Sequence, residues 1–226
     1  MNVIDTFYVI DFDRCIGNIN ESFRLLREII HDLSIVDEQT FSEIRIEVES
    51  RGNTFSAIEY IKNNYKSVDL DLIEKMYLKR ALVNSSKLLE SGAKIFLDTL
   101  SSRECYFCIM SFGDKKWQLM KIRGAGIKNT PAVIVSKSEK GEYINEWFDP
   151  SSGIFRIPKD FFLDKRSRQA KEIVLVDDKL SAFINLLPKV RGYLVTGASN
   201  KVVKNKKISQ SIKRVVQIDE IISYEF

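Results

Sequence analysis

Histidine and cysteine are scarce in this chain of 226 residues, which contains one histidine and three cysteines. His31 falls in a helical pattern far from the candidate nucleophiles, which argues against a serine or cysteine hydrolase that depends on histidine. Cys15, Cys105 and Cys108 are an odd number and too few for a disulfide framework, so they suit a reducing compartment. Cys105 and Cys108 have the spacing of a metal knuckle, but no second pair follows, and we expect buried cysteines of a strand.

Long apolar runs and a strong net charge are also missing. No run approaches the length of about 18 residues that a membrane span needs, and the N-terminus lacks a basic stretch followed by a long apolar one. We therefore expect a cytoplasmic protein with no membrane partner. The net charge of +4 is too mild to indicate a nucleic-acid-binding protein by itself.

One basic cluster lies in residues 201–214, and it contains no aromatic residue that could stack on a base. We interpret it as a solvated surface loop and do not expect nucleic-acid binding. Binding to an oligonucleotide that weakens steeply with salt would indicate otherwise. The basic residues are Lys201, Lys204, Lys206, Lys207, Lys213 and Arg214.

Residues 18–90 show helical periodicity throughout. The apolar spacing predicts four helices, near 23–33, 41–48, 54–65 and 69–89, and Gly52 is predicted to end the second. In the fourth, we place Leu72, Met76, Lys79 and Val83 on successive turns. Helices of this kind bury one stripe each and need one another to do so. We therefore predict a helical cap domain over 18–90, inserted into a core domain formed by residues 1–17 and 91–226.

Strands and helices alternate from Gly92 onward, which predicts an α/β fold with a doubly wound parallel sheet. A polar side chain directly follows each of five apolar runs, so polar chemistry should gather at one edge of the sheet. The predicted strands from this point are 105–110, 132–135, 173–176, 192–195 and, at an edge, 215–218. The polar residues that end the apolar runs are Asp11, Ser111, Ser136, Asp177 and Thr196.

The apolar run that ends at Asp11 and Asp13 carries the clearest chemical signal. Phe7–Ile10 has the composition of a strand buried on both faces, and residues two apart in extended chain point to the same side. Two close carboxylates repel, so one can attack while the other holds a proton, and their oxygens suit magnesium. Asp69 and Asp71 repeat the tripeptide without an apolar run, which is more typical of a helix start.

Taken in order, these motifs resemble those of the haloacid dehalogenase-like hydrolase superfamily, in its form with a helical cap. Residues 9–13 resemble its first motif, an apolar strand that ends in Asp-x-Asp. Residues 109–113 resemble the second, a strand that ends in Ser or Thr, and residues 117–121 are similar to what often follows it. Residues 174–178 resemble the fourth, a strand that ends in an acidic pair. Each motif is short, but their order and spacing extend over nearly the whole chain.

The third motif of the family is a lysine between the second and the fourth, and we assign it to Lys140. Lys137, Lys159 and Lys165 compete for this assignment. Lys140 is preferred because residues 141–144 could start a helix there, as in many relatives.

Most members of this superfamily are magnesium-dependent phosphatases, and the resemblance implies roles for the motif residues. Asp11 would be the nucleophile that attacks phosphorus and forms an aspartyl-phosphate. Asp13 would protonate the leaving oxygen and then take a proton from the attacking water. Ser111 and Lys140 would bind the phosphoryl group.

The resemblance also implies a magnesium site. Mg²⁺ would be held by Asp11, the backbone carbonyl of Asp13 and an acid of the Asp177–Asp178 pair. Asp178 is the preferred ligand, because relatives that have a glycine followed by a single aspartate align that aspartate with Asp178. Asp177 would either lie just outside the set of direct ligands or share the ion with Asp178. Helical caps favour small phosphorylated molecules as substrates, and the sequence leaves the substrate and the oligomeric state open.

Two other functions are compatible with the same motifs. A phosphomutase uses the same two aspartates and a similar cap, and a catalytically silent binding module could keep the fold. A dehalogenase is less expected because it has no use for the acidic pair at Asp177–Asp178. The family usually places threonine or a small apolar residue after the second aspartate, whereas Arg14 and Cys15 follow here, and we assign Arg14 no catalytic role.

Overall fold

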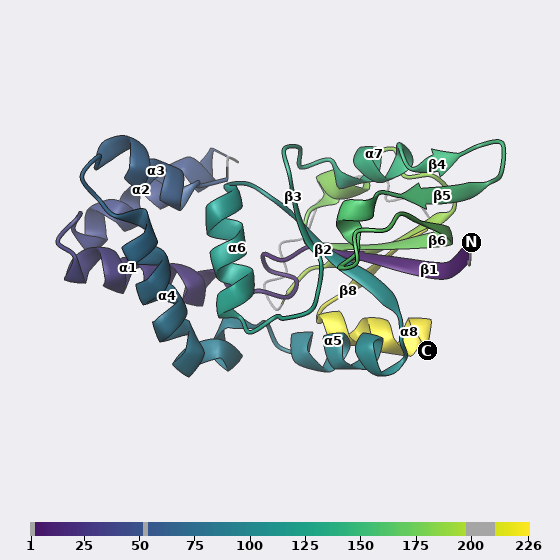
Figure 1. The fold of residues 1–226 in the computed structure, drawn as a ribbon, viewed down its shortest axis with the longest axis horizontal. Helices are drawn as coiled ribbons and strands as arrows, with labels where there is room; N and C mark the ends of the chain where they lie inside the picture. Colours follow the sequence, from purple (N-terminus) through teal and green to yellow (C-terminus); the bar gives the residue numbers. More distant parts are fainter. Residues whose placement is uncertain (1–2, 52–53, 198–210) are drawn as a thin grey trace. The chain divides into compact units, whose positions relative to one another are not determined.

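The computed structural model describes residues 3–51, 54–197 and 211–226, and the chain forms two compact units (Figure 1). Gly52 and most of the basic cluster, from Lys201 to Lys207, lie outside the described residues. The α/β unit consists of Met1–Ile16, Glu90–Ser111 and Asn129–Phe226, and the helical unit of Gly17–Leu89 and Phe112–Lys128.

The α/β unit contains the doubly wound sheet that the sequence predicts. The described residues form eight strands in one sheet, with β1 between β2 and β6, and every pair among β1, β2, β6, β7 and β8 that is in contact is parallel. The chain builds outward from β1 to β2 and β3, then crosses to β6, β7 and β8, so the winding reverses beside β1. Ligands of open α/β sheets bind at such a switch point. These strands are β1 (Val3–Ile10), β2 (Tyr106–Phe112), β3 (Ala132–Val135), β6 (Arg168–Asp177), β7 (Val190–Val195) and β8 (Ile212–Val215).

Two short antiparallel strands, β4 (Phe148–Asp149) and β5 (Ile154–Ile157), complete the sheet and were not predicted. β5 pairs with the first residues of β6, whereas β7 pairs with its later residues, so these two strands share the edge of β6 that lies away from β1. The predicted edge strand was placed too late, because β8 ends at Val215. The prediction of buried strand cysteines is correct for Cys108, whereas Cys105 precedes β2 and is only half-buried.

Side chains of β1 alternate between the two faces of the sheet. Phe7 contacts Phe162 on one face with ring centroids 5.3 Å apart, and Tyr8 contacts Phe226 on the other at 6.5 Å. Figure 1 shows α7 on one side of the sheet and α5 and α8 on the other. The 3₁₀ turns η2 and η3 contact α7, and η4 contacts α5 and α8. These elements are α5 (Ala93–Ser102), α7 (Lys140–Asn145), η2 (Lys159–Phe161), η3 (Leu180–Phe183), η4 (Ile218–Ile221) and α8 (Ile222–Glu225).

The helical unit has an aromatic core, and carboxylate or amide side chains cap several of its helices. Trp117 contacts Phe23 and Tyr77, with ring centroids 5.4 Å and 5.3 Å apart. Gly124 allows α6 to approach α4, because a Cβ there would lie 2.8 Å from the ring of Tyr77. This packing explains why 112–128 falls in the helical unit, whereas the predicted boundary left it in the core domain. The helices are α1 (Ile19–Asp32), α2 (Glu38–Ser50), α3 (Ala57–Asn64), α4 (Leu70–Asn84), η1 (Ser85–Leu88) and α6 (Lys115–Gly124).

The buried stripe of α4 differs from the positions that the sequence suggested. Ile73, Tyr77 and Ala81 are fully buried, whereas Val83 is 86% exposed. The buried stripe is therefore shifted by one residue, because the large ring of Tyr77, rather than Met76, enters the core. None of the described helices has both the length and the apolar character needed to cross a membrane.

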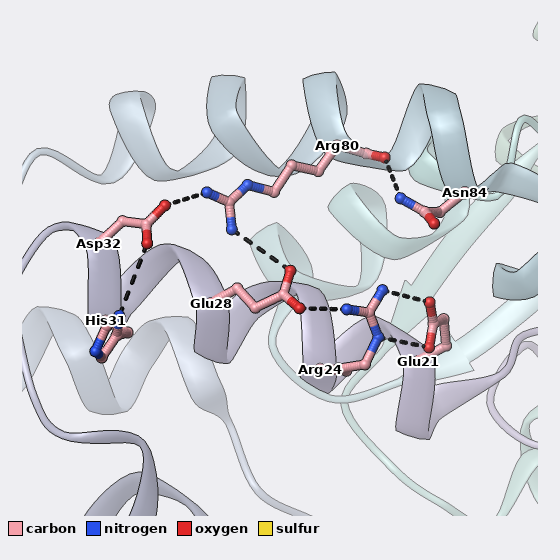
Figure 2. Close-up of polar contacts among 7 residues, drawn as sticks. All are labelled: Glu21, Arg24, Glu28, His31, Asp32, Arg80 and Asn84. Atoms are coloured by element: carbon pink, nitrogen blue, oxygen red, sulfur yellow. Dashed lines mark hydrogen bonds and ion pairs between the residues drawn. The ribbon is translucent and has the colours of Figure 1, made fainter.

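A chain of ion pairs joins α1 to α4 on the surface of the helical unit (Figure 2). Arg24 pairs with Glu21 and Glu28 along α1, and Arg80 of α4 reaches across to Glu28 at 3.6 Å and to Asp32. Partly exposed pairs of this kind contribute modestly to stability and are sensitive to salt.

Candidate active site

β1 delivers Asp11 to the carboxyl edge of the sheet. The last residue of the strand, Ile10, lies opposite Ile109 of β2 and Val176 of β6. The backbone N–H of Asp11 donates to the carbonyl of Val176 at 2.8 Å, which continues the ladder by one residue. β6 ends at Asp177, one residue beyond the partner of Ile10, so Asp11 and the acidic residue that ends β6 meet at the same edge.

Lys140, the first residue of α7, joins two of these carboxylates. Its Nζ donates to Asp11 Oδ1 and, at 2.7 Å, to Asp177 Oδ2. Successive side chains of a strand point to opposite faces of the sheet, so residues an even number apart, such as Phe7 and Asp11, lie on the same side. This is the side of the sheet that α7 covers. The relative exposures of Asp11, Lys140 and Asp177 are 6%, 3% and 2%, so the contact is buried. The three lysines that compete with Lys140 in the sequence, Lys137, Lys159 and Lys165, are all exposed.

The electrostatics of this contact follow from burial and crowding. Burial raises the pKa of Asp11 above its usual value, and the repulsion from Asp177, Asp178 and Asp13 adds to the rise, while Lys140 opposes it. Burial opposes the charge of Lys140, but the two carboxylates outweigh it and raise the pKa of the ammonium group. Lys140 therefore remains a cation, and its charge favours the ionised form of Asp11 against the effect of burial.

Asp178 and Cys15 lie beside Asp11 in a second cluster. One ligand atom from each of the three side chains lies within 4.8 Å of the other two. Burial, followed by repulsion from Asp177, raises the pKa of Asp178 to about 6. Arg14 Nη1 lies 3.7 Å from a carboxylate oxygen of Asp178 and partly offsets this charge.

A tight turn after β1 produces this second cluster. The carbonyl of Phe12 accepts from the N–H groups of Cys15 at 3.3 Å and Ile16 at 3.0 Å. Arg14 has a φ of 64°, a left-handed conformation that is uncommon outside glycine and is often found at functional sites. Arg14 and Cys15 were not assigned to the site from the sequence, because the only signal was their departure from the family pattern.

Ser111 and Asp13 complete the set of predicted residues. Ser111 is buried near the end of β2, and no hydrogen bond joins its hydroxyl to Asp11 or Lys140 in the described part of the chain. Asp13 is half-buried and close enough to Asp11 to raise its pKa. The structure thus brings Lys140 into direct contact with both Asp11 and Asp177, with Asp13, Asp178 and Ser111 around the same strand ends.

The donor set fits a hard divalent cation. Asp11 and Asp178 offer carboxylate oxygens from two adjacent strand ends, and magnesium prefers such oxygens and few protein ligands. Asp177 is engaged instead with Lys140, and its other oxygen accepts from the N–H of Lys179 at 2.8 Å. Asp178 is therefore the member of the acidic pair that is better placed for an ion.

Comparisons with known proteins identify the fold. No protein-family model matches the sequence, and no curated protein matches it. A haloacid dehalogenase-like hydrolase from Burkholderia xenovorans has a TM-score of 0.62 at 15% identity, over 98% of this chain and 97% of that one. CbbY from Rhodobacter sphaeroides, solved in complex with phosphate, has a TM-score of 0.50 at 12% identity, over 97% and 96%. The chain therefore has the haloacid dehalogenase-like fold, as the order of its motifs predicted.

Proposed function

We propose that this chain, which has the fold of the haloacid dehalogenase-like hydrolases, is a magnesium-dependent phosphatase of small phosphate monoesters. The observation that carries the proposal is the buried contact of Lys140 with Asp11 and Asp177, with Asp178 beside it at the same sheet edge. A buried carboxylate at a strand end, with a perturbed pKa and a lysine cation in contact with it, has the properties of a nucleophile.

In the first step, a carboxylate oxygen of Asp11 attacks phosphorus and the ester P–O bond breaks. Asp13 gives its proton to the leaving oxygen. In the second step, Asp13 takes a proton from water as the water attacks the same phosphorus, which releases inorganic phosphate and restores Asp11. At the end of the cycle, Asp13 is therefore protonated again and Asp11 is again a free carboxylate.

The remaining polar residues bind the transferred group. Lys140 offsets part of its negative charge, and Ser111 donates a hydrogen bond to one of its oxygens. Asp11, the backbone carbonyl of Asp13 and Asp178 would hold magnesium, which supplies further positive charge next to the phosphoryl oxygens. Asp177 acts through Lys140, whose position and charge it maintains.

The substrate is a small phosphorylated molecule, and the helical unit acts as the cap that selects it. The phosphate bound to CbbY, which shares this fold, supports a phosphorylated ligand. The three free cysteines support a reducing compartment such as the cytoplasm.

The proposal is tested by hydrolysis of an aryl phosphate with magnesium and with a chelator. We expect turnover that needs magnesium and that falls at least about a thousandfold in Asp11→Asn, or about 4 kcal/mol. Asp71→Asn is the matched control, because Asp71 belongs to the other Asp-x-Asp tripeptide and is exposed at the start of α4. Full activity of Asp11→Asn, or equal activity with the chelator, would overturn the proposal.

A further inference from the structure

We propose that Cys15, together with Asp11 and Asp178, forms a binding site for a thiophilic divalent ion such as zinc, and that this ion competes with magnesium. Its competition with magnesium rests on the proposed function, whereas binding of the thiophilic ion does not. Among the described residues, this is the one group of three or more histidine, cysteine, aspartate or glutamate side chains that comes together closely enough to hold a metal.

The position of the thiol carries the inference. Cys15 is 1% exposed, and its Sγ lies within 4.8 Å of a carboxylate oxygen of both Asp11 and Asp178. No hydrogen bond engages this thiol in the part of the chain that the structure describes, although buried polar groups are usually paired. The turn closed by the Phe12 carbonyl fixes the backbone of Cys15, so the thiol is held against the two carboxylates.

The chemistry of the three ligands distinguishes this ion from magnesium. Zinc and cadmium bind thiolate sulfur together with carboxylate oxygen, whereas magnesium selects oxygen. Zinc lies about 2.0 to 2.3 Å from its ligands, which places tetrahedral ligand atoms about 3.5 Å apart. The ligand atoms, which lie within 4.8 Å of one another, therefore need to approach by up to about 1.3 Å, and rotation of the carboxylates about their side-chain bonds is the movement that we propose for this.

The neighbouring charges permit this contraction. Lys140 donates to Oδ1 of Asp11, so Oδ2 can face the ion. Arg14 is exposed and lies 3.7 Å from Asp178, so it can withdraw into solvent when a cation takes its place. Binding displaces the proton of the Cys15 thiol into solvent, and a sulfur–metal bond forms in place of the S–H bond.

The experiment is a titration of the intact chain with Cd²⁺, followed by the ultraviolet sulfur-to-metal charge-transfer band and repeated with added magnesium. We expect one equivalent of Cd²⁺ to produce the band and magnesium to weaken its binding. Cys15→Ser and Cys15→Ala should lose the band and bind Cd²⁺ at least about tenfold more weakly. Mutation of a residue that only hydrogen-bonds to a metal ligand already lowers metal affinity by about tenfold or more, so loss of a direct ligand should cost at least as much. Cys105→Ser is the matched control, since its half-buried thiol lies outside the cluster, and it should keep the band.

The outcomes separate this inference from the phosphatase proposal. A band that persists in both Cys15 variants, that disappears in Cys105→Ser, or that is missing from the unmodified protein would overturn the inference. Cd²⁺ binding that is unaffected by magnesium would overturn the shared site. Each of these results leaves magnesium-dependent hydrolysis and its loss in Asp11→Asn unaffected. Circular dichroism of both Cys15 variants identifies any loss of fold, and the serine variant keeps nearly the volume of the thiol.

Discussion

Replacement of Lys140 by methionine should destabilise the α/β unit strongly in the absence of metal. Lys140 Nζ lies 2.7 Å from Asp177 and also contacts Asp11, and all three side chains are buried. At an effective dielectric constant of 20, the attraction to Asp177 alone is about 6 kcal/mol before the cost of burying the charges. Removal of one partner from a buried ion pair usually costs about 3 to 5 kcal/mol, and this is the loss we expect at pH 7.

The loss should depend on pH in a defined direction. In the folded chain, Lys140 opposes the rise that burial and the neighbouring carboxylates cause in the pKa of Asp11, so its removal raises that pKa further above the value in the unfolded chain. The folded variant then binds more protons than the unfolded variant, so its stability falls as the pH rises. Between pH 7 and pH 5, uptake of one proton should recover up to about 2.7 kcal/mol, at about 1.4 kcal/mol per pH unit.

Urea unfolding with a chelator, at pH 7 and pH 5, measures both effects. Lys137→Met is the matched control, because Lys137 is exposed on the segment that precedes α7, and it should change stability by less than about 0.5 kcal/mol. Addition of Asp177→Asn to Lys140→Met should restore part of the loss by removing one uncompensated charge. The reasoning is refuted if the two lysine variants lose equal stability, or if the deficit of Lys140→Met is the same at both pH values.

Three further predictions concern other parts of the chain. Burial, followed by the charge of Glu225, raises the pKa of Tyr8 in the folded chain. The stability that depends on its protonated hydroxyl is therefore complete below about pH 10 and is lost above it. The free energy of unfolding, measured from pH 9 to 12, should fall less steeply with pH in Tyr8→Phe than in the unmodified protein. Gly141→Ala would place a Cβ 2.7 Å from the carbonyl of Ala182, so urea unfolding should show a loss of about 1 to 3 kcal/mol, and unchanged stability would contradict this packing. Arg80→Met should lower the melting temperature slightly at low salt and not at about 1 M NaCl, where surface ion pairs are screened.

The sequence was sufficient to predict the order of the main elements and the edge at which polar residues gather. Buried parallel strands such as β1 are apolar on both faces, so the change to Asp11 marks the end of the strand clearly. The start of α7 at Lys140 was predicted from the residues that follow it, and the structure begins the helix there. These features depend on local composition, which is why they can be read from the sequence.

Features that depend on packing between distant segments could not be predicted in this way. The stripe of α4 was misplaced by one residue because several apolar residues compete, and the contact of Tyr77 with Trp117 decides which face is buried. β4 and β5 are too short to show a clear alternation. The position of Cys15 beside Asp11 and Asp178 depends on the backbone turn, which residue types alone do not specify.

The central claim is that Asp11 carries the phosphoryl group during turnover. The direct measurement is to mix the protein with an aryl phosphate and magnesium, quench with acid within the turnover time, and map the phosphorylated peptide by mass spectrometry. The account predicts a phosphoryl group on Asp11 that is missing in Asp11→Asn and that disappears when substrate is exhausted. Turnover with the phosphoryl group on another residue, or with Asp11 never modified, would contradict it.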